Sequence, residues 1–250
     1  MKAMVLAAGL GTRLRPLTED RPKALVEVAG RTLLEITLAR LREFGILEVI
    51  INVHHHAEMI EVYLRSRGNF GMNLRISRED DLLDTGGGLR KAGWFFLEDP
   101  GREGGETPFL LHNVDVISNI DFHEMIEFHS GKNALATLAV QERESSRYLL
   151  FDGSMELSGR QAGRGARPDF VRPAYAAQPL AFSGIHVISP RLIPLMTEPG
   201  AFSIIESYLR LAAQGERILG FRADQYFWRD LGKPAEIRRA AADIEAQRLP

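Results

Sequence analysis

The segment MVLAAGLGTR at residues 4–13 decides the fold of this chain. Its first part, Met4 to Ala7, is a short apolar run typical of a β-strand, and Gly9 and Gly11 follow at once. Glycine has no Cβ, so the backbone can turn tightly there and come close to a ligand. Successive main-chain N–H groups in such a turn form a cradle for phosphate oxygens. The segment therefore predicts a strand that leads into a phosphate-binding loop.

Two cations strengthen this prediction. Arg13 closes the segment, and Lys23 follows Pro22 ten residues later. Together they supply the positive charge that a polyphosphate needs, which indicates a nucleoside triphosphate or a similarly charged ligand. The structural alternative is an ordinary strand-to-loop turn that carries two surface cations.

The dinucleotide pattern of nicotinamide oxidoreductases fits this segment less well. Gly9 and Gly11 match its first two glycines, but Leu14 stands at the third glycine position. The loop is not closed by Gly-Lys-Ser/Thr either, so it lacks the Walker pattern. The segment is therefore predicted to be a phosphate-binding loop that follows neither the dinucleotide nor the Walker pattern.

The composition limits the function class. With 31 Lys and Arg against 33 Asp and Glu, the formal net charge of −2 argues against a nucleic-acid binder that works by bulk charge. The absence of cysteine excludes disulfides and Cys-ligated metals and suits the cytoplasm. No apolar run approaches the roughly 20 residues that span a bilayer. We therefore expect a cytoplasmic protein without a nucleic-acid or membrane partner.

Strand and helix patterns alternate through the first half of the chain. Apolar residues recur with helical spacing over 32–44, and Gly45 follows as a stop. Such alternation implies βαβ units and a mostly parallel, mixed sheet flanked by helices, the Rossmann-like α/β class. The other elements predicted here are strands at 48–53, 74–77 and 109–112 and helices at 58–67 and 88–97.

After about residue 134 the pattern changes to short strand-like runs without helices between them, at 134–140, 148–151 and 182–188. Helical patterns return at 203–213 and 234–246. We expect one α/β domain over residues 1–250, with an inserted mixed or antiparallel region. Residues 1–133 and 134–250 form its two parts.

The segment 158–178 is rich in Gly, Pro and Ala, and it holds four arginines against the single acid Asp169, a local charge of +3. Loops of this length are often functional or disordered. We expect a flexible loop, and the alternative is a mobile rim that attracts an anionic substrate.

Two aspartates are candidate ligands for a divalent metal. Asp115 follows the apolar strand at 109–112, and Asp230 follows an aromatic, strand-like stretch just before the last helix. Open α/β sheets bind ligands at the carboxyl ends of their strands. Mg²⁺ is held by a few carboxylate oxygens, with phosphate and water completing its shell. Neither aspartate alone is strong evidence for a metal site. The prediction rests on the two aspartates together with the N-terminal loop, because a triphosphate bound there would need a divalent metal.

A second glycine cluster, DTGGG at 84–88, lies between a predicted strand and a predicted helix. Three glycines at the start of a helix allow a flat ligand such as a base or a ribose to approach the backbone closely. The structural alternative is a flexible helix entry.

These motifs together resemble the signature of the sugar-phosphate nucleotidyltransferases, which make NDP-sugars from sugar 1-phosphates and nucleoside triphosphates. L-A-A-G-x-G-T-R with P-K carries the likeness at the N-terminus. Asn113-Val114-Asp115 is similar to the family's N-G-D metal motif, with Val114 where glycine is usual. Phe182 to Ile185 resembles the sugar-site strand, and Trp228 to Gly232 the W-x-D-x-G metal motif. The likeness covers nearly the whole chain and implies the nucleotide-diphospho-sugar transferase type of fold.

The resemblance also implies a role for each matching residue. Arg13 and Lys23 would be catalytic, Asp115 and Asp230 would hold Mg²⁺, and residues 1–133 and 134–250 would be the nucleotide-binding and sugar-binding parts. Asn113 and Gly184 are expected to bind the sugar. The residues expected to bind the nucleotide are Leu6, Ala8, Gly9, Gly11, Thr12, Arg13, Lys23, Glu79, Thr85 and Gly87.

The substrates are predicted from the same resemblance. The DTGGG cluster is similar to that of N-acetylmuramate-1-phosphate uridylyltransferases, whereas mannose-1-phosphate guanylyltransferases more often show G-T-A-G there. We therefore favour UTP and N-acetylmuramate 1-phosphate, with a role in cell-wall recycling. GTP with mannose 1-phosphate and a non-catalytic nucleotide-sugar sensor are the alternatives. The chain is expected to be a monomer or a homodimer.

Overall fold

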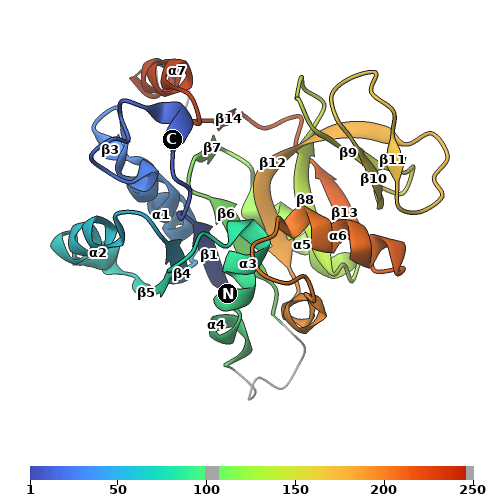
Figure 1. The fold of residues 1–250 in the computed structure, drawn as a ribbon, viewed down its shortest axis with the longest axis horizontal. Coiled ribbons are helices and arrows are strands. Elements are labelled where there is room, and N and C mark those ends of the chain that lie inside the picture. Colours follow the sequence, from blue (N-terminus) through green and yellow to red (C-terminus); the bar gives the residue numbers. More distant parts are fainter. Residues whose placement is uncertain (99–106, 246–250) are drawn as a thin grey trace.

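The computed structural model of the chain describes residues 1–98 and 107–245 (Figure 1). Within these residues, ten strands form one twisted sheet, whose main path runs β11-β10-β9-β12-β6-β1-β4-β5. The strands β8 and β13 continue the sheet beside β12. The expected α/β fold with a mixed central sheet is confirmed.

The N-terminal half of the sheet is parallel. Strand β1 (Lys2–Leu6) lies between β4 (Glu48–Val53) and β6 (Phe109–Asn113), and β5 (Asn73–Arg78) pairs with β4. All four strands run in the same direction, so their carboxyl ends meet at one edge of the sheet. This edge is where open α/β sheets bind ligands.

The second half of the sheet is mainly antiparallel and begins at the long strand β12 (Gln178–Ile188). One part of β12 pairs antiparallel with β6, and another pairs with β9 (Tyr148–Phe151). The other strands here are β8 (Ala136–Gln141), β10 (Leu157–Gln161), β11 (Asp169–Phe170) and β13 (Ile218–Arg222). The inserted antiparallel region expected after residue 134 is therefore present, and only β13 runs parallel to its partner β8.

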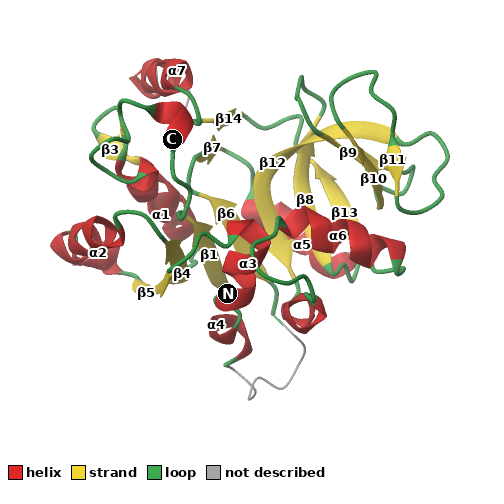
Figure 2. Cartoon of the chain, in the orientation of Figure 1, coloured by secondary structure: helices red, strands yellow, loops and turns green. Residues whose placement is uncertain are grey.

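Helices cover both faces of the sheet (Figure 2). Because side chains alternate along a strand, Val5 contributes to the apolar core on one face and its neighbour Met4 to the core on the other. The first core is closed by α1 (Leu33–Glu43), α2 (Ala57–Ser66), α5 (Phe122–Gly131) and α7 (Pro234–Glu245). The second is closed by α3 (Asp84–Lys91), α4 (Trp94–Leu97) and α6 (Ile204–Ala213).

Short elements complete the described residues. Two two-stranded sheets pair β2 (Glu27–Val28) with β3 (Arg31–Thr32), and β7 (Val116–Ser118) with β14 (Trp228–Asp230). Short 3₁₀ segments occur at Thr12–Leu14, Lys23–Leu25, Gly68–Gly71 and Pro190–Leu195. No helix within residues 1–98 and 107–245 is both long and apolar enough to cross a bilayer.

The helix predicted at 32–44 forms for local reasons. The side chain of Thr32 accepts a hydrogen bond from Glu35 N at 3.1 Å and caps the first turn. Gly45 has a positive φ of 70°, and this left-handed conformation ends the helix. Glycine adopts it readily because it has no Cβ.

The helix predicted at 88–97 is wrong in its extent. Helix α3 begins at Asp84, because the N–H groups of Gly86 and Gly87 donate to Phe202 O and hold this turn in place. Helix α3 ends at Lys91, and the separate helix α4 begins after Gly93. A Cβ at Gly93 would lie 2.7 Å from Ile193. At the other end of the chain, Ala246 of the last predicted helix lies outside the described residues.

Three buried histidines should make folding stability depend on pH. Burial lowers the pKa of His112 and of His129 to about 4 and that of His186 to about 3. In the unfolded chain each histidine has its ordinary pKa of 6.5 and becomes protonated below that pH. Between pH 6.5 and pH 4 the unfolded chain therefore binds more protons than the folded chain. Stability should therefore be full above pH 6.5 and fall toward pH 4, by about 1.4 kcal/mol per pH unit for each histidine.

Urea unfolding at pH values from 4.5 to 7.5 measures this slope. The variant His129→Asn should reduce the slope by the contribution of one histidine, about 1.4 kcal/mol per pH unit. The variant His123→Asn, at an exposed position on α5, should leave the slope unchanged. A slope that is the same in all three proteins would contradict the prediction.

Candidate active site

A cleft of about 570 Å³ opens at the carboxyl ends of β1, β4 and β6. Seven residues that the sequence analysis selected line it, namely Leu6, Ala8, Gly9, Lys23, Thr85, Asn113 and Asp115. They come from four separate parts of the chain. Asn52, Leu82 and Asp84 also line the cleft. The remaining selected residues are not part of this lining, namely Gly11, Thr12, Arg13, Glu79, Gly87, Gly184 and Asp230.

The glycine loop after β1 presents main-chain donors. Within residues 1–98 and 107–245, the N–H groups of residues 8–11 donate no hydrogen bond. Gly11 has a positive φ of 65°, and a Cβ at this position would lie 3.2 Å from the Cβ of Lys23. The loop therefore packs closely against Lys23. Main-chain N–H groups that have no acceptor, together with the nearby ammonium group of Lys23, form a suitable place for an anion.

Asn52, at the end of β4, ties this loop to the next one. Its Oδ1 accepts a hydrogen bond from Ala7 N at 2.7 Å, and its Nδ2 donates to Glu79 Oε1 at 2.7 Å. The other carboxylate oxygen of Glu79 accepts from Leu83 N at 3.0 Å. Glu79 is only 4% exposed, so both of its oxygens serve the chain itself. Its expected contact with the nucleotide stays a prediction.

The DTGGG cluster forms the first turn of α3 instead of an open loop before it. A Cβ at Gly86 would lie 2.3 Å from the ring of Phe202, and one at Gly88 would lie 2.7 Å from Glu79 Oε1. These glycines are therefore needed because segments of the chain approach each other closely. Of the cluster, Asp84 and Thr85 line the cleft. Gly87 is buried below it.

The two candidate metal ligands lie on adjacent segments. Strand β14 places Asp230 opposite Val116, and Leu231 N donates to Asp115 O at 2.8 Å. The carboxylate of Asp115 forms a short ion pair with Lys23 Nζ, and that of Asp230 accepts from Gly232 N at 2.7 Å. A Cβ at Gly232 would lie 2.6 Å from Asp230 Oδ1 and 2.9 Å from Arg13 Nη2, so Arg13 also reaches this place.

These carboxylates fit a divalent cation that binds together with phosphate. Among the described residues, no group of three or more His, Cys, Asp or Glu side chains could hold a metal by itself. One or two carboxylates, completed by phosphate and water oxygens, are the usual ligands of Mg²⁺ at phosphate-transfer sites. Asp115 and Asp230 therefore fit a metal whose remaining ligands come from the substrate.

The strand expected to bind a sugar is distorted next to the cleft. The register of β12 against β8 shifts between Phe182 and His186, and Gly184 has a positive φ of 74°. A Cβ at Gly184 would lie 2.8 Å from Asn113 Nδ2, so the two residues are in close contact. Asn113 Oδ1 is buried and has no hydrogen-bond partner within the described residues. Buried side-chain acceptors in folded proteins nearly always have a partner, so this one is unusual.

Sequence reasoning missed two features of this site. Asn52 carried a signal, because it is a polar residue at the end of an apolar parallel strand. Arg143 carried none, because it lies in the loop that follows β8. Its guanidinium carbon lies 3.6 Å from the centroid of the Trp228 ring.

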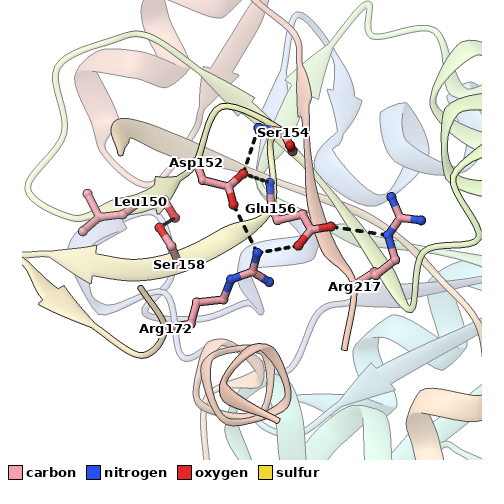
Figure 3. A network of polar contacts seen from close by, with 7 residues as sticks. All are labelled: Leu150, Asp152, Ser154, Glu156, Ser158, Arg172 and Arg217. Atoms are coloured by element: carbon pink, nitrogen blue, oxygen red, sulfur yellow. Dashed lines mark hydrogen bonds and ion pairs between the residues drawn. The ribbon is translucent and has the colours of Figure 1, made fainter. Parts of the chain in front are cut away.

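The segment 158–178 is partly strand, and most of its arginines are paired. Ser158 is fully buried in β10 and donates to Leu150 O at 3.0 Å. Figure 3 shows Arg172 between the carboxylates of Asp152 and Glu156, and Arg217 on the far side of Glu156. Arg160 pairs with Asp169 and Glu206, and Arg164 pairs with Glu144. The expected excess of +3 is therefore largely offset by nearby acids.

Comparison with known proteins agrees with this geometry. A family model described as nucleotidyl transferase matches residues 2–247. An N-acetylmuramate alpha-1-phosphate uridylyltransferase of Caulobacter vibrioides is 37% identical, over 96% of this chain and 97% of that protein. A mannose-1-phosphate guanyltransferase of Yarrowia lipolytica is 30% identical over 95% of this chain, which spans 62% of its length.

The fold is also found among solved structures. The crystal structure of HddC from Yersinia pseudotuberculosis, complexed with GMP-PN, superposes with a TM-score of 0.74 at 20% identity. The match covers 97% of this chain and 99% of that one.

The bridge from Asn52 to Glu79 can be tested by Glu79→Gln. An amide offers one acceptor oxygen where the carboxylate offers two, so either Asn52 Nδ2 or Leu83 N then faces an NH₂ group. We expect the free energy of unfolding to fall by about 1–3 kcal/mol. Urea denaturation measures it, with Glu48→Gln at an exposed position of β4 as the matched control. A loss no larger in Glu79→Gln than in the control would contradict the role assigned to this bridge.

Proposed function

This chain belongs to the nucleotidyl transferase family, and on that premise we propose that it makes a UDP-sugar and pyrophosphate from UTP and N-acetylmuramate 1-phosphate in a Mg²⁺-dependent reaction. The observation that carries the proposal is the convergence, in one cleft, of Ala8 and Gly9, whose N–H groups donate no hydrogen bond within the described residues, with Lys23 and Asp115. Asp230 and Arg13 lie at its side. A triphosphate needs such a combination of donors, cations and hard oxygen ligands.

The reaction is an in-line displacement at phosphorus. An oxygen of the sugar phosphate attacks the α-phosphorus of the triphosphate, a new P–O bond forms, and the bond to the β-phosphate oxygen breaks with release of pyrophosphate. Little covalent work falls to the protein, so positioning and charge stabilisation dominate. When bound at Asp115 and Asp230, Mg²⁺ supplies positive charge to the phosphate oxygens.

The side chains of the site have separate tasks in this scheme. The amides of the glycine loop, with Thr12 and Arg13, hold the β- and γ-phosphates and stabilise the leaving pyrophosphate. Lys23 lies between the α-phosphate and the incoming sugar phosphate and reduces the repulsion between the two anions. Its ion pair with Asp115 holds the ammonium in position before the substrates arrive.

The sugar and base are assigned to opposite ends of the cleft. Asn113 Oδ1 and the main chain at Gly184 receive the hydroxyl groups of the sugar. Thr85 and the first turn of α3, with Gly87 and Glu79 behind it, shape the place for the base. Residues 1–133 thus act as the nucleotide-binding part and residues 134–250 as the sugar-binding part of one domain. We assign the activity to the cytoplasm, as a monomer or a homodimer.

The choice of UTP is supported by the 37% identity to the uridylyltransferase along nearly the full length of both chains. The second candidate is a GTP:mannose-1-phosphate guanylyltransferase. It is supported by the 30% identity to the Yarrowia lipolytica protein, of whose length this chain spans 62%.

Pyrophosphate release across four nucleoside triphosphates and a panel of sugar 1-phosphates tests this choice, with and without Mg²⁺. We expect the highest kcat/KM for UTP with N-acetylmuramate 1-phosphate, and loss of turnover when the metal is removed with a chelator. A preference for GTP with mannose 1-phosphate would favour the second candidate. Full turnover in the chelator would contradict the role of the metal.

Single substitutions test the assigned residues. Lys23→Ala and Asp115→Asn should each lower kcat/KM by about 10²-fold or more, because each removes a charge that acts on the reacting phosphates. Thermal melting should show that both variants fold. Asp169→Asn, at an exposed aspartate on β11, is the control and should keep the wild-type rate. Wild-type rates in Lys23→Ala or Asp115→Asn would overturn the assignment.

A further inference from the structure

Arg143 lies between the sugar-site strand and the second metal motif. Its Nη2 donates a hydrogen bond to Phe182 O at 2.7 Å, one residue before Ser183 and Gly184. Its guanidinium carbon lies 3.6 Å from the centroid of the Trp228 ring. The indole of Trp228 in turn donates from Nε1 to Ser183 O at 2.7 Å. Arg143 and Trp228 therefore both donate a hydrogen bond to the main chain of the distorted part of β12.

The charge of this arginine is not neutralised by an ion pair. Within residues 1–98 and 107–245, no carboxylate oxygen lies within 4.0 Å of its guanidinium nitrogens. Its Nε is buried and has no hydrogen-bond acceptor there. Burial lowers the pKa of Arg143, and the carboxylate of Asp230 opposes this change through its negative charge. The neighbouring exposed arginines of the segment 158–178 differ, because Arg160 and Arg164 have acidic partners.

A partly buried cation without a counter-charge is costly, because the guanidinium loses water that no carboxylate replaces. Stacking on an indole recovers part of this cost and fixes the plane of the guanidinium, but it leaves most of the five N–H donors without an anion. A planar fork of this kind matches the oxygens of a phosphate or carboxylate. The arrangement is that of a prepared anion site near Gly184, which itself lies against Asn113 of the cleft lining.

We propose that Arg143 binds an anionic group of the sugar 1-phosphate. The inference rests on the proposed function, since it takes the sugar 1-phosphate as the ligand of this side. It adds a cation to Arg13, which acts on the triphosphate, and to Lys23, which lies between the two phosphates. The anion is either the phosphate itself or, in a sugar such as N-acetylmuramate, the carboxylate of its lactyl group.

Steady-state kinetics with Arg143→Met test the proposal. This variant keeps an aliphatic stem over Trp228 and removes the charge. With the nucleoside triphosphate saturating, we expect KM for the sugar 1-phosphate to rise about 10- to 100-fold, the range for a lost hydrogen bond to a charged group. KM for the triphosphate should change less than about threefold. Arg143→Lys restores the charge without the planar fork and should recover part of the loss.

Two sugars identify the anion. If KM rises for both N-acetylmuramate 1-phosphate and N-acetylglucosamine 1-phosphate, Arg143 binds the phosphate. If it rises only for the first, Arg143 binds the carboxylate. Arg147→Met, at an exposed position in the same loop, is the matched control and should behave as the wild type. An unchanged KM for both sugars, or an equal rise for the sugar and the triphosphate, overturns the proposal.

The experiment also separates this inference from the proposed function. If the wild-type protein releases no pyrophosphate with any pair of substrates, the proposed function fails. Arg143 is then tested by calorimetric titration of the two sugar 1-phosphates, with a non-hydrolysable triphosphate present. Binding that is equally strong in the wild type and in Arg143→Met, or absent from both, overturns the inference. If Arg143→Met does not fold, the same comparisons are made with Arg143→Lys, which should show a smaller but selective rise.

Discussion

The site depends above all on the hydrogen bond between Leu231 N and Asp115 O and on the antiparallel pairing of β14 with β7. This pairing joins residues that are more than 100 positions apart in the chain and places Asp230 next to Asp115. We propose that these two carboxylates, with phosphate and water oxygens, hold a divalent cation. The parallel strands β1, β4 and β6 then supply the glycine loop and the end of the cleft, whose lining includes Asp115. Moving β14 away would leave two unrelated surface aspartates.

Buried polar groups hold the loops around this cleft in a fixed relation. Asn52 connects Ala7 at the end of β1 with Glu79, and Glu79 connects onward to Leu83 before α3. Such a chain of hydrogen bonds is stable only when every member is satisfied, because an unpaired polar group is costly in a buried place. The loops after β1 and β5 are thereby adjusted to one another before any ligand arrives. The proposed sugar site is the opposite case, because within the described residues Asn113 Oδ1 has no hydrogen-bond partner and Arg143 has no carboxylate partner.

Much of the fold followed from local sequence. The apolar runs at 48–53 and 109–112 are strands within a residue of the predicted bounds, because continuous β-branched or apolar residues suit a strand buried on both faces. The extent of α3 did not follow, because glycine has a poor helix propensity. There the contacts of Gly86 and Gly87 with Phe202, more than 100 residues later, decide the conformation. The acidic partners of the segment 158–178 did not follow from local sequence either, since Glu206 and Glu144, which pair with Arg160 and Arg164, lie outside it.

The sequence by itself determined the class of fold, the position of the glycine loop and the set of polar residues that belong to the family pattern. Short-range features decide these, namely the position of glycine in a turn, the alternation of apolar residues and the charges near a loop. Only the tertiary structure decided which polar groups are already used and which are still available. Glu79 has both oxygens occupied, whereas Arg143 has no carboxylate partner among the described residues. That difference depends on distances between segments far apart in the chain, which no local pattern records.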